Sequence, residues 1–303
     1  MFKSPWSFDI LNKTESDAII NQLLKFLLCE LKEKNMSISH FRIQKAIFKI
    51  KMELGQNHPL YDYLPFYWFE DGPFSSVVSK EFKELKNKYS PHTVFLSEKS
   101  YEKFSKENQL IDEYPIINEI SEGIFKNLFS NTFDEDIYLD YAPFSFMHPF
   151  KYVLYETTRD NDLYSSLTVD NYLNVFYDCL SQLPYNNLLV DFSVLFSRLF
   201  TRLELLNDEN QFFNAWRYIT PPVQLSWLTF ARWVRIYEHD RFYDDKINFW
   251  KNDFKNSIKY LNSSIDKFED KTENIFTDSS SDYNYDSFKH NMLNATVGNY
   301  LKD

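Results

Sequence analysis

Apolar side chains recur every three or four residues along much of the chain, and this spacing predicts amphipathic helices. One helix is predicted from Thr14 or Ser16 to about Lys34. A second follows Ser39, whose hydroxyl can cap the free amides of its first turn, and ends at Gly55. The N-terminal part of the chain is therefore expected to be largely helical.

A short aromatic segment interrupts this helical pattern. Residues 65–69 (PFYWF) suit a half-buried strand, because aromatic side chains pack well on a pleated surface. Asp71-Gly72-Pro73 follows and predicts a tight turn in which Gly72 takes a positive φ. Ser75 or Ser76 can then cap a further helix to about Lys88.

The segment after this helix has two interpretations. Residues 93–96 and 101–104 could pair as a hairpin, which would form the wing of a winged helix. A loop followed by a short helix fits the same residues. A helix is then predicted over 116–129, whereas the Pro-containing segment 132–148 is expected to be irregular and to hold a domain boundary within 134–149.

Helical periodicity dominates the second half of the chain. Short connections separate the predicted helices, which implies antiparallel neighbours in a bundle. The predicted helices cover residues 149–158, 169–182, 187–206, 209–218, 222–239 and 244–269. The sequence thus predicts a mainly α protein, with a small α/β winged-helix-like module over 1–133 and an aromatic-rich antiparallel helical bundle over 150–275. Residues 277–303 are expected to be a flexible acidic tail with a short terminal helix.

Composition narrows the functional classes. The 303 residues include only four glycines, and no Gly-x-Gly-x-x-Gly or P-loop pattern occurs. Loops that cradle phosphate need clustered glycines, so a Rossmann dehydrogenase, a P-loop ATPase and a kinase are disfavoured. No cofactor, metal site or catalytic residue is predicted.

Cysteine use and charge add two expectations. Cys29 and Cys179 each lie in an apolar helical run and are expected to be buried free thiols. Few thiols and no signal peptide indicate a cytoplasmic protein, and no apolar run is long enough to span a membrane. Basic and acidic residues number 16 and 14 through Leu110, but 17 and 30 after it. The acidic second part should therefore repel nucleic acid.

Residues 41–88 carry a family resemblance. Ile43-Gln44-Lys45-Ala46-Ile47-Phe48, followed by the turn Phe69–Ser75 (FEDGPFS) before a helix, resembles the Panacea or SocA-like group of phage-associated, antitoxin-like proteins, and related archaeal winged-helix-like proteins. Ile43 and Ala46 stand where members tend to have leucine, and Asp71 where they have an aromatic residue. The resemblance implies an antitoxin-like role that could include transcriptional control, with the N-terminal module contacting a partner or DNA.

Two candidate binding surfaces lie within this region. Tyr67, Trp68, Phe69, Glu70 and Asp71 combine aromatic rings with carboxylates, as protein-binding surfaces do. The alternative is that these rings are core residues beside a turn.

The second candidate is a stripe of Arg42, Lys45 and Lys49, with Gln44 beside it, on the helix that follows Ser39. It could contact DNA phosphates, or it could be an ordinary solvated helix face.

A third cluster allows an enzymatic alternative. His239-Asp240 is the kind of dyad that holds a metal in hydrolases, although further ligands would have to gather in space. Arg235 and Arg241 lie near several carboxylates, and ion pairs near a helix end are the favoured interpretation of the cluster. The leading prediction is a non-enzymatic regulatory or interaction protein that binds a protein partner, with homo-oligomer formation open. The alternatives are a DNA-binding regulator and a metal-dependent hydrolase.

Overall fold

The computed structural model describes residues 13–89, 98–107, 114–160, 168–206, 209–239 and 245–277. The chain forms two compact units, one of residues 1–141 with 237–243 and the other of residues 142–236 with 244–303. The first unit extends beyond residue 133, where the winged-helix-like module was predicted to end. The predicted tail, from residue 278 on, lies outside the described residues.

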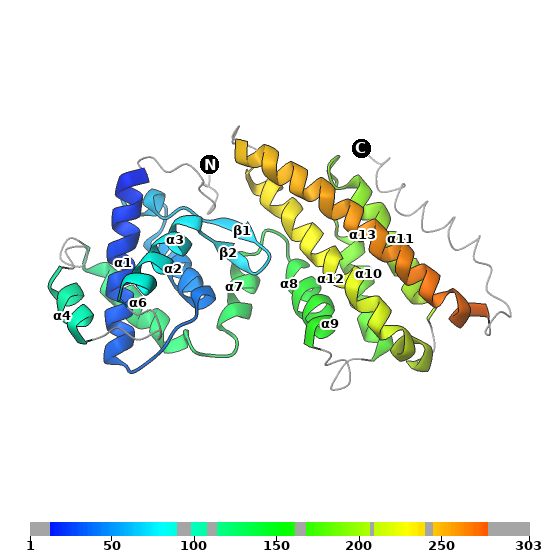
Figure 1. Cartoon of the computed structure of the whole chain (residues 1–303), viewed down its shortest axis with the longest axis horizontal. Coiled ribbons are helices and arrows are strands. Elements are labelled where there is room, and N and C mark those ends of the chain that lie inside the picture. Colours follow the sequence, from blue (N-terminus) through cyan, green and yellow to red (C-terminus); the bar gives the residue numbers. More distant parts are fainter. Residues whose placement is uncertain are drawn as a thin grey trace. The chain divides into compact units, whose positions relative to one another are not determined.

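The first unit is built around α2 (His40–Leu54) (Figure 1). The helix begins where Ser39 was expected to cap it, since the Ser39 hydroxyl accepts a hydrogen bond from the Arg42 amide at 3.2 Å. It ends at Gly55, which has a φ of 75°. The other helices are α1 (Lys13–Glu33), η1 (Tyr61–Tyr63), α3 (Ser76–Tyr89), α4 (Glu98–Glu107), α6 (Ile116–Asn127) and α7 (Phe133–Tyr141).

A two-stranded antiparallel hairpin, β1 (Tyr67–Phe69) and β2 (Gly72–Phe74), connects η1 to α3. Gly72 has the predicted positive φ, at 101°. A Cβ at this position would lie 3.2 Å from the Tyr138 ring, so both backbone conformation and packing favour glycine.

Two predictions for the first unit are wrong. Residues 101–104 belong to α4, which is the short helix of the second interpretation, and do not form the second strand of a wing; residues 93–96 lie outside the described residues. The segment 132–148 is not irregular, because it contains α7.

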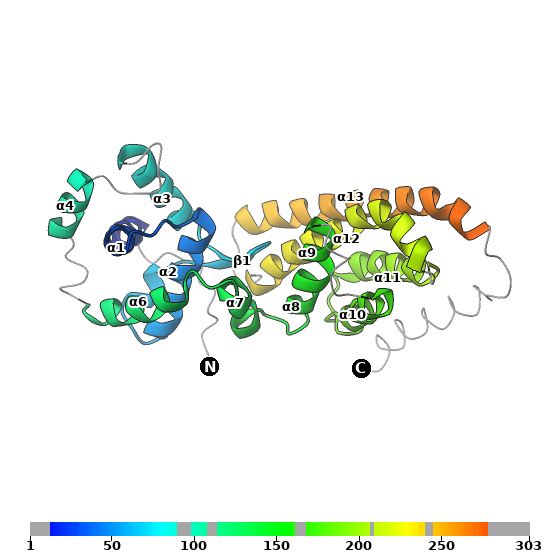
Figure 2. The same ribbon diagram turned by 90° about the horizontal axis from the view of Figure 1, so that it is seen from below.

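The second unit is a helical bundle, seen from a second side in Figure 2. A continuous helical segment comprises α8 (Met147–Pro149), the π-helical η2 (Phe150–Tyr155) and α9 (Glu156–Asp160). The long helices are α10 (Val169–Ser181), α11 (Val190–Glu204), α12 (Glu209–His239) and α13 (Asp245–Thr277). Arg198 of α11 bonds Asp266 and Glu269 of α13, which fixes the register of these two helices.

Stacked aromatic rings fill the centre of this bundle, which was predicted to be rich in aromatic residues. Phe196 of α11 stacks on Phe150, Phe176 and Phe192, with ring centroids 5.0, 4.3 and 5.3 Å away. Cys179 is fully buried and Cys29 nearly so, and both are free thiols.

The predicted break at Pro221 is wrong, because α12 continues through both Pro221 and Pro222. Each proline removes one backbone donor. In an α-helix the carbonyls that lose these donors are those of Arg217 and Tyr218, whereas the hydroxyls of Thr220 and Ser226 bond the carbonyls of Trp216 and Pro222, at 3.1 and 2.7 Å. In the described ranges, no helix combines the length and apolarity needed to cross a membrane.

Candidate partner-binding groove

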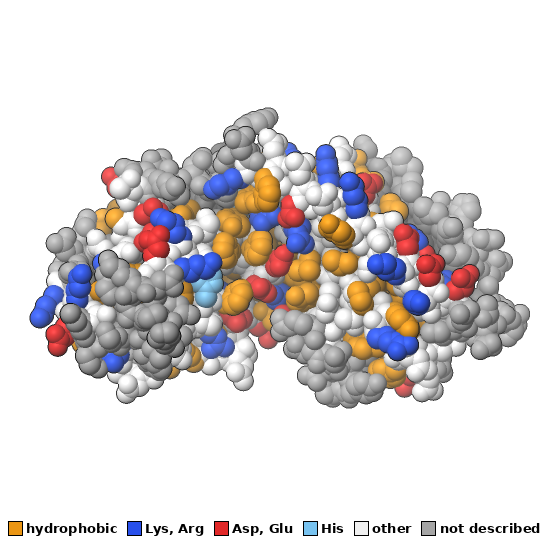
Figure 3. Space-filling model, in the orientation of Figure 1, with side chains coloured by type: hydrophobic (Ala, Val, Ile, Leu, Met, Phe, Trp, Pro, Cys, Tyr) orange, Lys and Arg blue, Asp and Glu red, His pale blue; other side chains and the backbone are white. Residues whose placement is uncertain are grey.

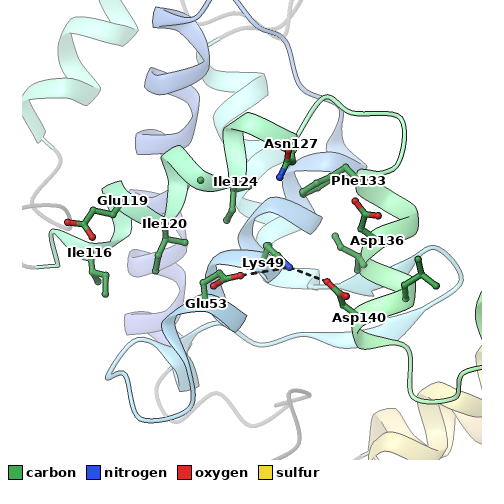
Figure 4. A pocket seen from close by; sticks show the side chains of 13 residues that line it. Lys49, Glu53, Ile116, Glu119, Ile120, Ile124, Asn127, Phe133, Asp136 and Asp140 are labelled. Atoms are coloured by element: carbon green, nitrogen blue, oxygen red, sulfur yellow. Dashed lines mark hydrogen bonds and ion pairs between the residues drawn. The ribbon is translucent and has the colours of Figure 1, made fainter.

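A pocket of about 720 Å³ opens between α6 and α7, with α2 beneath it (Figure 4). We call it the α6–α7 groove. Its apolar lining consists mainly of branched aliphatic side chains. Those from α6 are Ile116, Ile120 and Ile124, and those from α7 are Phe133, Ile137 and Leu139.

Two of these apolar side chains are unusually exposed. Ile116 is 47% and Leu139 is 63% accessible to solvent. Gly123, also on the wall formed by α6, carries no side chain, and a Cβ there would meet no atom within 4 Å. The groove is therefore open to solvent and has room for an additional side chain.

The polar groups of the groove are mostly acidic. Four carboxylates line it, together with a single lysine amine, Lys49. Lys49 lies 3.4 Å from the Asp140 carboxylate and 3.8 Å from that of Glu53, and it bonds the Tyr141 hydroxyl at 3.1 Å. Burial alone would lower the pKa of Lys49, but the bonds to Tyr141 and Asp140 outweigh it and the pKa is raised. The amine is therefore a fixed positive charge.

The predicted basic stripe supports this groove. Arg42 donates to the carbonyls of Leu128 and Ser130, at 3.1 and 3.4 Å, and thereby fixes the turn between α6 and α7. Lys45 pairs with Asp134 in the first turn of α7 at 3.0 Å, and Lys49 reaches Asp140 in its last turn.

DNA contact by this stripe stays a prediction, although the structure engages all three basic side chains within the first unit. Lys45 is only 5% exposed and Gln44 only 2%, whereas Arg42 and Lys49 are half-buried, so the stripe is not a fully solvated helix face. Gln44 instead joins α2 to the start of α3, since its amide donates to the Ser75 carbonyl and accepts from the Ser75 amide at 3.0 and 2.9 Å.

Figure 3 shows basic and acidic side chains interspersed over the visible face of the second unit.

The aromatic segment is divided between core and surface. Trp68 is fully buried against the Tyr138 ring, with centroids 4.9 Å apart, so the prediction that it anchors a partner at the surface is wrong. Its neighbours Tyr67, Phe69, Glu70 and Asp71 are half-buried. The Glu70 carbonyl also accepts a hydrogen bond from the Tyr138 hydroxyl at 2.8 Å, which ties the hairpin to α7.

The proposed metal dyad is not assembled in the described part of the chain. His239 is fully buried, and its ring lies 6.2 Å from that of Tyr67. Asp240 and Arg241 lie outside the described residues. Among the residues that are described, no three His, Cys, Asp or Glu side chains gather as a metal site would require. Arg235 pairs with Asp253 of α13 at 3.3 Å.

The groove itself was missed from the sequence because α7 was not predicted. A signal was present, since Phe133, Ile137 and Tyr141 recur every four residues and predict one face of a helix. Pro143 and the dense aromatics of this segment obscured it.

Comparison with protein family models, curated proteins and solved structures found no match.

Proposed function

We propose that this chain is a non-enzymatic interaction protein whose α6–α7 groove binds a segment of a protein partner. The observation that carries the proposal is the groove's combination of apolar walls, a charged rim and exposed aliphatic side chains. Concave apolar surfaces with polar rims are where binding energy concentrates in protein interfaces. The resemblance over residues 41–88 favours an antitoxin-like or phage-associated role for this interaction. On the same resemblance we propose that the N-terminal module is winged-helix-like.

The groove is also rigidly supported, which favours recognition over accidental exposure. Arg42, Lys45 and Lys49 hold the α6–α7 turn and both ends of α7 against α2. A pre-organised surface loses less conformational entropy when a partner binds. The folded protein therefore already holds the groove in one conformation before a partner binds.

The experiment uses a photo-crosslinking amino acid at Leu139 in the full-length chain, expressed in its own host. Tyr260, a 68% exposed residue of α13, serves as a control position in the second unit. We expect Leu139 to crosslink one protein specifically. The same protein, once purified, should bind the wild-type chain with defined stoichiometry.

A second substitution tests whether the groove is responsible. Gly123→Trp should fill the groove without a clash at the Cβ and abolish the crosslink. Glu122→Trp places the same side chain on an exposed position of α6 that does not line the groove, and it should leave the crosslink intact. A crosslink that persists in Gly123→Trp, or one that is no stronger from Leu139 than from Tyr260, would overturn the proposal.

A further inference from the structure

The charges of the α6–α7 groove are not equally available to a partner. Lys49 already engages Asp140 and Glu53. Asp136 accepts a hydrogen bond from the Thr132 hydroxyl at 3.2 Å but faces no cation in the described part of the chain. Glu119 likewise forms no ion pair among the described residues.

These two carboxylates lie on opposite walls of the groove. Glu119 belongs to α6 and Asp136 to α7, with the aliphatic side chains between them (Figure 4). Both side chains are exposed. A partner that fits the groove therefore meets negative charge on each side of its apolar surface.

The walls also indicate the backbone form of the occupant. Ile116, Ile120 and Ile124 form an i, i+4, i+8 row on α6 that is about 12 Å long at helical rise. Phe133 and Ile137 form a similar row on α7. Rows at this spacing accept the ridges of another helix. These walls offer no strand edge for an added strand and only one aromatic ring, Phe133, for a polyproline segment.

We infer that the groove takes a basic amphipathic helix of a protein partner. This inference rests on the proposed function. The helix has an apolar stripe of about two turns, which packs between the two walls. Lysine or arginine residues flank the stripe on both sides, where Glu119 and Asp136 pair with them. Lys49, beside the groove floor, opposes excess positive charge near Asp140.

The test is a selection from a displayed library of helical peptides with random apolar and flanking positions, using the full-length chain as target. Binders are retained only if Gly123→Trp abolishes their binding while Glu122→Trp does not. The retained sequences should carry an i, i+3, i+4, i+7 apolar stripe with basic flanks.

Charge variants then test the recognition directly, with one selected peptide as the probe. Glu119→Gln combined with Asp136→Asn should weaken binding by about three- to tenfold, as expected for exposed ion pairs. Glu122→Gln removes an exposed carboxylate of α6 that does not line the groove, and it should leave the affinity unchanged. Circular dichroism must show that each variant is folded.

The outcomes separate the two proposals. Peptides that require the open groove but carry acidic or uncharged flanks would overturn the inference and leave the proposed function standing. Basic-flanked peptides whose affinity is unchanged by the loss of the Glu119 and Asp136 charges would also overturn the inference. If no selected peptide is sensitive to Gly123→Trp, the inference fails, and the crosslink from Leu139 then decides separately whether the proposed function stands.

Discussion

Lys51 is a fully buried lysine on α2, and its charge should make the stability of the first unit depend on pH. Its ammonium donates to the Leu64 carbonyl at 2.7 Å and lies 4.4 Å from the centre of the Tyr61 ring. Burial lowers its pKa from 10.5 to about 7, although Asp62 acts in the opposite direction. The unfolded chain therefore holds a proton between pH 7 and 10.5 that the folded chain releases.

In that window stability should rise with pH, and below about pH 7 the folded protein carries the full cost of burying the charge. At about 1.4 kcal/mol per unit of pKa, the effect is on the order of 5 kcal/mol. Lys51→Met removes this pH-dependent cost. The unfolding free energy of the variant should therefore increase relative to that of wild type as pH falls from 10 to 7. Chemical denaturation across this range measures the difference. The exposed Lys255→Met is the control, and parallel curves for Lys51→Met and wild type would contradict the prediction.

The helix face on which a residue lies was easier to predict than the residues that it contacts. The spacing of Arg42, Lys45 and Lys49 correctly placed them on one face of a helix. Their partners, Leu128, Asp134 and Asp140, lie about 90 residues further along the chain, and no local pattern links the two segments. The sequence pattern of a basic stripe is the same whether its side chains contact water, DNA phosphates or a neighbouring helix. Only the folded structure distinguishes these cases.

Replacing each of two glycines in the first unit with alanine should change the free energy of unfolding in opposite directions. Gly123 lies within α6, where an added Cβ meets nothing, so Gly123→Ala should stabilise the protein by about 0.5–1 kcal/mol through helix propensity. Gly72 has a φ of 101° and lies against Tyr138, so Gly72→Ala should destabilise it by at least about 1 kcal/mol. Thermal and chemical unfolding measure both. A destabilised Gly123→Ala would show that position 123 does not lie in a regular helix with open space beside it.

Elements with both periodicity and a stop signal were predictable, as α2 shows with Ser39 at its start and Gly55 at its end. Local signals failed where tertiary packing decided the outcome. Pro221 and Pro222 predict a break, yet α12 continues because its apolar side chains, such as Phe212, Trp227 and Phe230, pack into one core on both sides of the prolines. Propensity costs of a few kcal/mol are small against such burial.

At the scale of the whole molecule, charge argues against nucleic acid as the ligand. The formal net charge is −11 at pH 7. Non-specific DNA binding depends on cations that are free to replace the counterions of the phosphates. The stripe on α2 is already bonded within the first unit, so we expect no retardation of a labelled DNA duplex at about 50 mM salt with protein up to about 10 μM.

If the stripe on α2 holds α6 and α7 in place, substitutions in it should lower the stability of the first unit. Arg42→Gln should lower the unfolding free energy by about 1–3 kcal/mol, because the Leu128 and Ser130 carbonyls lose their charged donor. It should leave the duplex unretarded, as in wild type. DNA binding that weakens steeply with salt and disappears in Arg42→Gln, with stability unchanged, would reverse this assignment. It would also restore the stripe as a phosphate-contacting surface, because a residue that only braces α6 and α7 cannot be lost without loosening the first unit.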